Sequence, residues 1–470
     1  VLSGGQRGAC RCGACRRAGD GRGQPRKRGL FARAVAAEVS KDIERLTGGP
    51  VDGLDFEVLE REVRRSAIST AAALVAARLN ADLSDGEAAE LPCACGADAR
   101  NVGRRPRTFI TALGPLTLER AWYHCPSCAR GFSPRDRALA LDGTSLSPAV
   151  TRMVGVTAAE LSFEKSSTLL RELADLEVIP RQVERHAEAL GGAIARDERD
   201  IIEPEPPGAP TLYLGLDGTG IPVRKSETEG RAGKQPDGSA RTREVKLATI
   251  WSAESRDTEG RPVRDAGSVT FNAAIESIAT RDTDTEPAPF AKRVLREMER
   301  RDFFAVDRRV VLGDGAPWIW NFADEHVPDA IQIVDVFHAK QHVFDVARAL
   351  YGKGSDLAAQ WGKARRDELD QGRLDLVIAA LRRHASHCDE AARNIAYFQT
   401  NRARMDYPRF REQGLCVSTG VVEGGCKSLI GGRLKRGGMH WSVSGANSII
   451  ALRCAVHSNR FDDYWERRAG

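Results

Sequence analysis

Three acidic residues of this sequence stand where carboxylates could bind divalent metal ions. Asp217 and Asp314 each end an apolar segment that we predict to be a strand, and a glycine follows each of them. In open α/β sheets functional groups gather at strand ends, and glycine lets a bulky ligand approach the backbone. Converging carboxylates raise one another's pKa, so a cluster of Asp217, Asp314 and Glu423 favours binding of two cations, Mg²⁺ or Mn²⁺, which support in-line displacement at phosphorus. For each aspartate taken singly, a turn residue or a helix cap is the alternative.

The segment around Glu423 is predicted to form a short helix. Residues 418–420 can cap it, and the glycine pair 431–432 can end it. Such a helix would place Glu423 and Lys427 one turn apart, and the alternative to a metal ligand is an exposed Glu–Lys pair worth about 0.3 kcal/mol. The glycines at 424–425 each cost about 1 kcal/mol in a helix relative to alanine, which indicates that something approaches the backbone closely. The cations of residues 415–441 are predicted to contact DNA: Lys427, Arg433, Lys435 and Arg436.

Four cysteines have the spacing of a zinc site. Cys93 and Cys95 form a C-x-C pair, and Cys125 and Cys128 form a C-x-x-C pair about thirty residues later. Residues 107–123 between them alternate in polarity and contain Gly114-Pro115, which predicts a hairpin that folds the two pairs together. Four closed thiolate ligands predict a structural Zn²⁺ that staples the fold and catalyses nothing.

The remaining cysteines do not change that interpretation. The chain contains eleven cysteines, partly clustered and partly scattered, which fits metal ligation in a reducing cytosol better than a disulfide scaffold. Cys10, Cys12 and Cys15 form a second possible metal cluster, but they lie in a Gly- and Arg-rich stretch that is too poor in apolar residues to order itself. We therefore favour a disordered basic tail there.

A helix-turn-helix rhythm precedes the acids. Two helical segments over 162–176 and 181–190 flank Pro180, which suits the first position of the second helix. That helix would bury Val183, Ala187 and Leu190. Its exposed side chains are predicted to contact DNA, and they are Arg181, Gln182 and Arg185. A generic helical hairpin is the alternative.

The first two acids belong to a predicted mixed sheet. Strands are predicted over residues 211–223, 244–251, 268–273, 309–313 and 330–338, with helices over 289–301 and 318–326. Three early strands followed by alternating helix and strand indicate an α/β fold with helices flanking a mixed sheet. Residues 341–415 are mainly helical and separate the last strand from Glu423.

Composition divides the chain into several regions. Four prolines in residues 203–210 indicate a linker and the main domain boundary. The predicted order is a disordered basic tail (1–30), a helical region (31–90), a zinc-ribbon-like module (91–140), a helical, helix-turn-helix-like region (145–202), the linker (203–210) and a catalytic domain (211–470) with the helical insertion 341–415.

Four phrases together resemble a known family: Leu-Gly-Leu-Asp-Gly-Thr at 214–219, Leu-Gly-Asp-Gly-Ala at 312–316, Val-Asp-Val-Phe-His at 334–338 and Thr-Gly-Val-Val-Glu-Gly-Gly-Cys-Lys at 419–427. The chain resembles bacterial insertion-sequence transposases of the Asp-Asp-Glu type, close to the ISKra-type family, which have a ribonuclease-H-like core. The resemblance spans about residues 210–445 and is weaker over residues 1–90, to which no role is transferred.

The resemblance implies metal-dependent cutting of transposon ends, followed by attack of the freed 3′-hydroxyl on target DNA. It implies that Asp217, Asp314 and Glu423 are the metal ligands. Asp335 and His338 match an Asp-x-x-His element of related Mutator-like enzymes and are expected to contact DNA near the scissile phosphate; the alternative for His338 is a hydrogen-bonded core histidine. The expected partners are double-stranded DNA, as terminal repeats and target, and further copies of the chain in a homodimer or higher oligomer.

Other function classes fit less well. A haloacid-dehalogenase-type phosphatase needs an aspartate two residues before Asp217, where Gly215 stands. An actin-like sugar kinase is not expected to contain the two cysteine pairs or the cations near Glu423. A ribonuclease-H-like, structure-specific nuclease without strand transfer fits nearly as well, and an inactive DNA-binding regulator would lack one acid.

Bulk charge and hydropathy add little. The net charge of +5 does not by itself indicate a polyanionic partner. No apolar run approaches the roughly 20 residues that span a bilayer, and the N-terminus lacks a signal-peptide pattern. Together with the resemblance to bacterial transposases, this leads us to expect a cytoplasmic protein of the bacterial cell that associates with the nucleoid when bound to DNA.

Overall fold

A computed structural model describes residues 55–200, 208–233, 235–279 and 286–469, with a few isolated positions between 37 and 53. The predicted tail 1–30, with Cys10, Cys12 and Cys15, and the prolines at 204–207 lie outside these residues. The chain forms two compact units, one reaching to Val150 and including residues 174–176, the other comprising 151–173 and 177–470. Within the described ranges, no helix is both long and apolar enough to cross a membrane.

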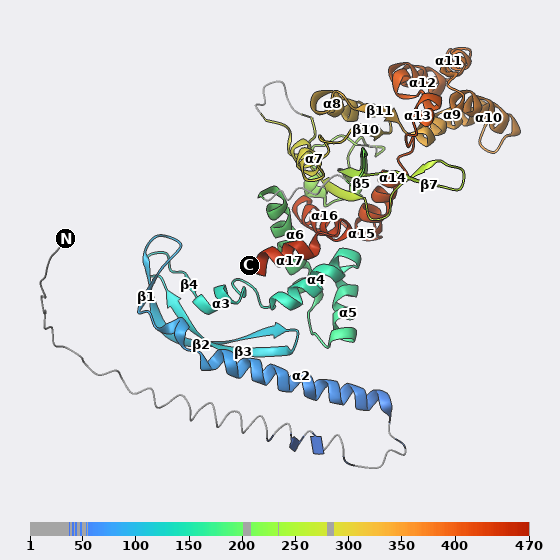
Figure 1. The fold of residues 1–470 in the computed structure, drawn as a ribbon. Helices are drawn as coiled ribbons and strands as arrows, with labels where there is room; N and C mark the ends of the chain where they lie inside the picture. Colours follow the sequence, from blue (N-terminus) through green and yellow to red (C-terminus); the bar gives the residue numbers. More distant parts are fainter. Residues whose placement is uncertain are drawn as a thin grey trace, which may run out of the picture. The chain divides into compact units, whose positions relative to one another are not determined.

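The first unit is built on a four-stranded antiparallel sheet (Figure 1). Its strands follow the chain order β1 (Glu90–Pro92), β2 (Asp98–Thr111), β3 (Gly114–His124) and β4 (Gly131–Phe132). The hairpin predicted over 107–123 is present, but its turn lies at residues 112–113, and Gly114 begins β3 with a φ of +87°. Gly114 is therefore needed for the left-handed backbone at the last position of the turn.

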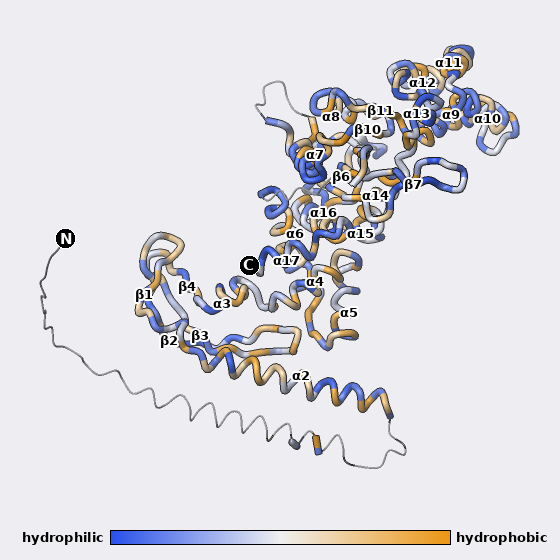
Figure 2. Tube along the Cα trace, in the orientation of Figure 1, coloured by the Kyte–Doolittle hydropathy of each residue, from blue (hydrophilic) through white to orange (hydrophobic). Residues whose placement is uncertain are grey.

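A long helix, α2 (Phe56–Ala81), lies along this sheet, with Asp55 accepting from the backbone N–H groups of Glu57 and Val58 at its start. Ala76 and Leu79 pack on a core that includes Phe109, Leu116 and Leu118. Figure 2 shows that the N-terminal half of α2 is mostly hydrophilic and the C-terminal half mostly hydrophobic. The segment 31–90 was predicted to be helical; in its described part the α-helix ends at Ala81, and the short 3₁₀ turn η1 (Ser84–Gly86) follows.

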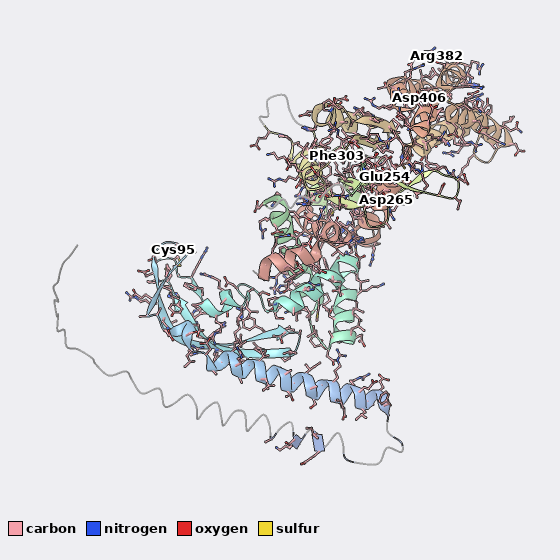
Figure 3. All side chains as sticks on the ribbon, viewed as in Figure 1. Cys95, Glu254, Asp265, Phe303, Arg382 and Asp406 are labelled. Carbon is pink, nitrogen blue, oxygen red and sulfur yellow. The ribbon has the colours of Figure 1, made fainter. Side chains whose placement is uncertain are left out.

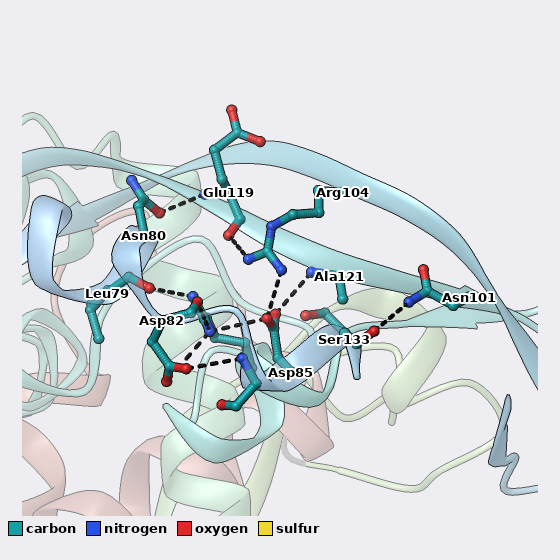
Figure 4. A network of polar contacts seen from close by, with 12 residues as sticks. Leu79, Asn80, Asp82, Asp85, Asn101, Arg104, Glu119, Ala121 and Ser133 are labelled. Atoms are coloured by element: carbon teal, nitrogen blue, oxygen red, sulfur yellow. Dashed lines mark hydrogen bonds and ion pairs between the residues drawn. The ribbon is translucent and has the colours of Figure 1, made fainter. Parts of the chain in front are cut away.

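Buried polar contacts fix the end of α2 to the sheet (Figure 4). Asp85 in η1 accepts hydrogen bonds from Arg104 at 2.8 Å, from the backbone N–H of Ala121 at 2.8 Å and from Arg135 at 3.0 Å. Arg135 belongs to the short helix α3 (Pro134–Ala138) and also donates to the carbonyl of Leu79. One carboxylate thereby ties β2, β3 and α3 to the end of α2, because it accepts hydrogen bonds from a residue of each of the three.

The second unit contains a five-stranded mixed sheet, as predicted. Its spatial order is β11-β10-β5-β6-β9, where β5 is Thr211–Pro222, β6 is Thr242–Trp251, β9 is Thr270–Ala274, β10 is Arg308–Gly313 and β11 is Ile331–Val334. β5 pairs antiparallel with β6, β6 antiparallel with β9, and β10 lies parallel to both β5 and β11. The fifth strand is shorter than predicted. It ends at Val334 because Asp335 caps the next helix.

Helices that precede and helices that follow the predicted linker in the sequence pack together beside this sheet. α6 (Pro180–Asp200) packs on α16 (Val443–His457), which in turn packs on β9. At the contact, a Cβ atom on Gly191 would lie 1.9 Å from the carbonyl oxygen of Ser448, so only glycine allows this approach. The main boundary predicted at 203–210 is therefore wrong: residues 151–173 and 177–200 belong to the same compact unit as the sheet.

The other helices of the second unit flank the sheet or precede it. They are α4 (Pro148–Glu160) and α5 (Phe163–Ala174), which start or end in the first unit, then α7 (Pro289–Arg300), α8 (Pro317–His326) and α17 (Phe461–Ala469). α5 and α6 cover the two segments predicted to be helical around Pro180.

The helical insertion forms one group of packed helices after β11 (Figure 1). Its members are α9 (Val336–Tyr351), α10 (Asp356–Asp370), α11 (Leu374–Arg382), α12 (Asp389–Thr400) and α13 (Tyr407–Glu412). Arg382 and Asp406, labelled in Figure 3, mark the end of α11 and the N-cap of α13. The insertion therefore begins at 336 rather than 341, because the residues expected to extend the fifth strand are helical.

Candidate active site

Asp217 within β5 and Asp314 directly after β10 lie at the same level of two neighbouring parallel strands. Leu312 of β10 pairs with Gly215 of β5, and each aspartate lies two residues further along its chain. Burial raises the pKa of Asp217, and the nearby Asp314 carboxylate raises it further, against hydrogen bonds from Gly218 N–H and Cys426 that lower it. Asp217 was predicted to end its strand, but β5 continues beyond it to Pro222. The charge of the Asp314 carboxylate therefore acts on the Asp217 carboxylate.

The Asp314 turn has a special backbone. The carboxylate Oδ1 accepts from the backbone N–H of Ala316 at 2.9 Å. Gly315 between them has a φ of +102°, a conformation that residues with a side chain rarely adopt. The glycine after this acid is thus required by the turn itself.

Glu423 lies on a helix that packs over β5. α14 (Gly420–Gly425) continues into a π-helical segment, η4 (Cys426–Gly431), and then into α15 (Gly432–Leu434). The glycine pair predicted to end the helix therefore lies inside it. Single π-helical turns insert one extra residue and are frequent at functional sites.

Two glycines allow this helix to approach the sheet. A Cβ atom on Gly215 would lie 2.0 Å from Cγ2 of Val422, and one on Gly425 would lie 2.8 Å from Cδ2 of Leu247. We predicted that something approaches the backbone of the helix glycines closely, and at Gly425 this is the protein's own sheet. At Gly424 a Cβ atom would meet nothing within 4 Å.

A thiol connects the helix to the first acid. Cys426 lies one turn after Glu423 and forms a hydrogen bond with Asp217. Burial raises the pKa of Cys426 well above its usual range, and the charges of Asp217 and Glu423 add to that rise in pKa. The thiol therefore stays protonated and senses both carboxylates. Sequence reasoning missed this residue, because only the packing of α14 on β5 brings it to Asp217.

Glu423 also forms the ion pair that was the alternative to metal binding. Lys427 donates to its Oε1 at 2.6 Å, with the side chains of Lys427 and Glu423 exposed by 74% and 47%. Glu423 and Lys427 therefore lie one helical turn apart, as predicted, and they form the predicted Glu–Lys ion pair. In this structure the acids do not converge tightly: among the described residues, the one group of at least three His, Cys, Asp or Glu side chains whose ligand atoms all lie within 4.8 Å is the set of four cysteines.

The buried Asp335 and the partly exposed His338 form a pair beside the acids. Asp335 caps α9 by accepting from the backbone N–H of His338 at 2.7 Å, and its other oxygen accepts from Oγ1 of Thr419 at 2.9 Å. Burial would raise the pKa of Asp335, but hydrogen bonds from His338 and Thr419 outweigh it and lower that pKa. The hydrogen bond from His338 to Asp335 raises the pKa of His338, and the charges of Asp314 and Asp217 raise it further. His338 thus shares an electrostatic environment with both aspartates.

Arg433 was predicted to contact DNA, and that prediction is wrong. Its side chain is 0% exposed, and Nε donates to the carbonyl of Ala158 at 3.0 Å. The guanidinium lies 4.8 Å from the ring centroid of Phe163 and 5.2 Å from that of Trp441. Burial lowers the pKa of Arg433 to about 10. Its guanidinium packs α15 against α4 and α5 and is not available to a ligand.

The other predicted DNA contacts reach the surface. Lys427, Lys435, Arg181 and Arg185 are exposed, and Gln182 and Arg436 are partly exposed. Lys435 donates to Oγ1 of Thr219, two residues after Asp217 on β5. Arg436 donates to the carbonyls of Gly432 at 2.7 Å and Glu160 at 2.9 Å. Lys435 therefore contacts β5 two residues after the first acid.

The four cysteines converge in the first unit. Cys93 and Cys95 lie between β1 and β2, and Cys125 and Cys128 lie between β3 and β4. The Sγ atoms of Cys93 and Cys128 are 3.6 Å apart, and those of Cys95 and Cys125 are 3.7 Å apart. Four thiolates at about 2.3 Å from a tetrahedral ion would be about 3.8 Å from one another. Figure 3 labels Cys95, one member of this group. The four cysteines could hold a metal ion such as zinc.

No family model matches the chain, and no curated protein matches it in sequence. Among solved structures, the chain is similar to the Drosophila P element transposase strand transfer complex, with 12% sequence identity and a TM-score of 0.26. That alignment covers 72% of this chain and 85% of the other. A TM-score this low identifies neither fold nor activity, so the function has to be inferred from the chain's own residues.

Proposed function

We propose that this chain is a DNA transposase of the Asp-Asp-Glu type, which cuts the ends of an insertion sequence and joins the freed 3′-hydroxyls to target DNA. The observation that carries the proposal is the placement of the acids. Asp217 on β5 and Asp314 directly after β10 lie at the same level of neighbouring strands, and the helix that bears Glu423 packs on β5 through Val422 and Cys426. This arrangement is what the four matching sequence phrases imply for their acids.

The sheet supports a ribonuclease-H-like core. Three consecutive antiparallel strands, β5, β6 and β9, are joined by two parallel strands, β10 and β11, that pair on the other side of β5. The first two acids thereby come from the central strand and its parallel neighbour. The third comes from a helix after the helical insertion, in the order that the resemblance implies.

The acids fit a divalent cation site chemically. Burial and the charge of Asp314 raise the pKa of Asp217, so a bound cation would stabilise its ionised carboxylate, and carboxylate oxygens are the ligands that Mg²⁺ and Mn²⁺ prefer. Asp217, Asp314 and Glu423 would hold two such ions. When bound, Mg²⁺ or Mn²⁺ supplies Lewis-acid stabilisation of the phosphoryl oxygens in an in-line displacement.

The rest of the site would bind and orient DNA. His338, which Asp335 holds in place and whose pKa is raised, would donate a hydrogen bond to a phosphate oxygen near the acids. Lys435 and Lys427 would neutralise neighbouring phosphates. In the first reaction water displaces the 3′-oxygen at phosphorus; in the second the released 3′-hydroxyl displaces a 3′-oxygen of the target. Each step breaks and forms one P–O bond.

Additional DNA contacts would come from α6. Arg181, Gln182 and Arg185 reach the surface on one side of the helix, while Val183, Ala187 and Leu190 on the other side are buried. This division is what a recognition helix needs. The four-cysteine group would hold a structural Zn²⁺. The active form would be a homodimer or higher oligomer on DNA.

The test is to separate DNA binding from DNA breakage. Purified chain with Mg²⁺ or Mn²⁺ is incubated with a labelled fragment carrying the sequences that flank its gene, and Glu423→Gln is compared with the wild type. We expect wild-type protein to nick the fragment and join its ends to plasmid DNA, and the variant to bind the fragment without nicking it. Nicking without joining would indicate a nuclease, and binding without nicking by both proteins would indicate an inactive regulator.

A further inference from the structure

Two tyrosines of the helical insertion donate to the ends of the strands that lead to the site. The hydroxyl of Tyr397 on α12 donates to the backbone carbonyl of Asp314 at 2.9 Å. The hydroxyl of Tyr407 on α13 donates to the carbonyl of Val334 at 3.1 Å. Asp314 directly follows β10, and Val334 ends β11, so the insertion contacts the same end of two neighbouring parallel strands.

We propose that Tyr397 is a positioning residue for Asp314, so that the insertion sets the direction of the second acid of the metal site. The inference rests on the proposed function, since it gives the insertion a role in that same site. Tyr397 reaches the backbone of Asp314 and not its carboxylate. It acts on metal binding through the peptide that orients the carboxylate.

The ring of Tyr397 also shapes the turn sterically. A Cβ atom on Gly315 would lie 2.5 Å from Cε2 of Tyr397, so the ring packs directly on the glycine that follows Asp314. On the other side of the turn, Oδ1 of Asp314 accepts from Ala316 N–H. The turn from Asp314 to Ala316 is therefore held by the hydroxyl and the ring of Tyr397 and by the Asp314 carboxylate.

The insertion in turn fixes the ring. Tyr397 stacks on His342 of α9, with ring centroids 3.9 Å apart and an interplanar angle of 25°. Nδ1 of His342 lies 2.7 Å from Oδ1 of Asn394, and Nδ2 of Asn394 donates to the carbonyl of Glu390 at 2.8 Å. The ring of Tyr397 on α12 is thus fixed by stacking on α9. Burial raises the pKa of Tyr397 well above its usual range, so the hydroxyl remains a donor at any physiological pH.

This geometry gives the insertion a specific task. A partner that orients a metal-binding group is typically worth about 10- to 100-fold in metal affinity or activity. Because a neutral hydrogen bond to a carbonyl lies at the lower end of such effects, we expect Tyr397→Phe to weaken divalent-cation binding about tenfold. The phenylalanine retains the ring against Gly315 and His342, so the fold is preserved.

The experiment compares full-length wild type with Tyr397→Phe and with the matched control Tyr351→Phe. Tyr351 lies in the same insertion and contacts the rings of Trp361 and His384. Binding of Mn²⁺ without DNA is measured from the electron paramagnetic resonance signal of the free ion. Cleavage of the flanking-DNA fragment is then measured across a range of Mn²⁺ concentrations, and thermal unfolding shows whether each variant is folded.

We expect Tyr397→Phe to raise the Kd for Mn²⁺ and the Mn²⁺ concentration for half-maximal cleavage by similar factors, about tenfold. The maximal rate at saturating Mn²⁺ should recover, and Tyr351→Phe should match the wild type. Equal Mn²⁺ binding by Tyr397→Phe and wild type overturns the positioning role and leaves the proposed function intact. Absence of Mn²⁺ binding by the wild type overturns both.

Discussion

Val422 packs directly over Gly215, the residue two positions before Asp217. A Cβ atom at Gly215 would lie 2.0 Å from Cγ2 of Val422, 2.8 Å from the ring of Trp251 and 2.9 Å from Oγ1 of Thr249. The helix that carries Glu423 is therefore as close to the strand that carries Asp217 as the backbone permits. The distance between the first and third acids depends on this glycine.

Replacing Gly215 by alanine should move the two acids apart. The added methyl group has no space, and overpacking of this kind costs about 1–3 kcal/mol. We expect the midpoint of chemical unfolding to fall and DNA cleavage to be lost even in the folded fraction. Gly424→Ala is the control, because its Cβ atom meets nothing within 4 Å and alanine favours a helix by about 1 kcal/mol. Normal cleavage by folded Gly215→Ala would contradict the role of this contact.

Arg433 and Arg436 are close in sequence but should respond differently to substitution. Arg433→Ala removes a buried side chain from between Phe163 and Trp441 and leaves the Ala158 carbonyl without its donor. We expect a loss of about 2–4 kcal/mol in the free energy of unfolding. Arg436→Ala, at a partly exposed position, should change stability by less than about 1 kcal/mol and weaken DNA binding with a reduced salt dependence. Urea unfolding and DNA titration at two salt concentrations distinguish the two.

Much of the fold is readable from the sequence because it depends on local pattern. Apolar runs predict β5, β6 and β10, and the cysteine spacing predicts that the two pairs meet. These features require only neighbouring residues and the rule that strands bury their apolar faces. The positions of Asp217 and Asp314 follow once the strands are adjacent and parallel.

The remaining features arise from packing between distant segments. A cation in a glycine-rich segment looks like a DNA contact, yet Arg433 packs between Trp441 of the same segment and Phe163, which lies far away in the sequence. Cys426 reaches Asp217 only because α14 crosses β5, and Tyr397 reaches Asp314 across more than eighty residues. Likewise, the prolines predicted a domain boundary between α6 and the sheet, but α6 packs on α16 in the same compact unit. No local pattern carries that information.

The Asp335–His338 pair predicts a specific pH dependence. The pKa of His338 is raised above its ordinary value, so its contribution to stability is fully present below the unfolded pKa of about 6.5 and is lost as the pH rises through the folded pKa. Asp335, whose pKa is lowered, contributes stability above its unfolded pKa of about 3.9, and that part is lost as the pH falls through its folded pKa. We expect the NMR titration of the His338 ring to shift to lower pH in Asp335→Asn. An unchanged titration would show that Asp335 does not set the pKa of His338.

Removal of the metal should affect the two compact units unequally. We expect purified protein to contain one equivalent of Zn²⁺, because Cys93, Cys95, Cys125 and Cys128 are the described group with ligand atoms within 4.8 Å. Binding of structural zinc contributes folding free energy, so a chelator or Cys125→Ser should unfold the sheet β1–β4 at a lower temperature. The second unit has its own core and should keep its unfolding transition.

Cys416→Ser is the matched control for Cys125→Ser. Cys416 lies in the second unit, where its thiol donates to the Ser418 carbonyl, a bond that serine can also make. It should retain the full zinc content. If Cys125→Ser also retained one equivalent of zinc and unfolded like the wild type, the four cysteines would not be the ligands.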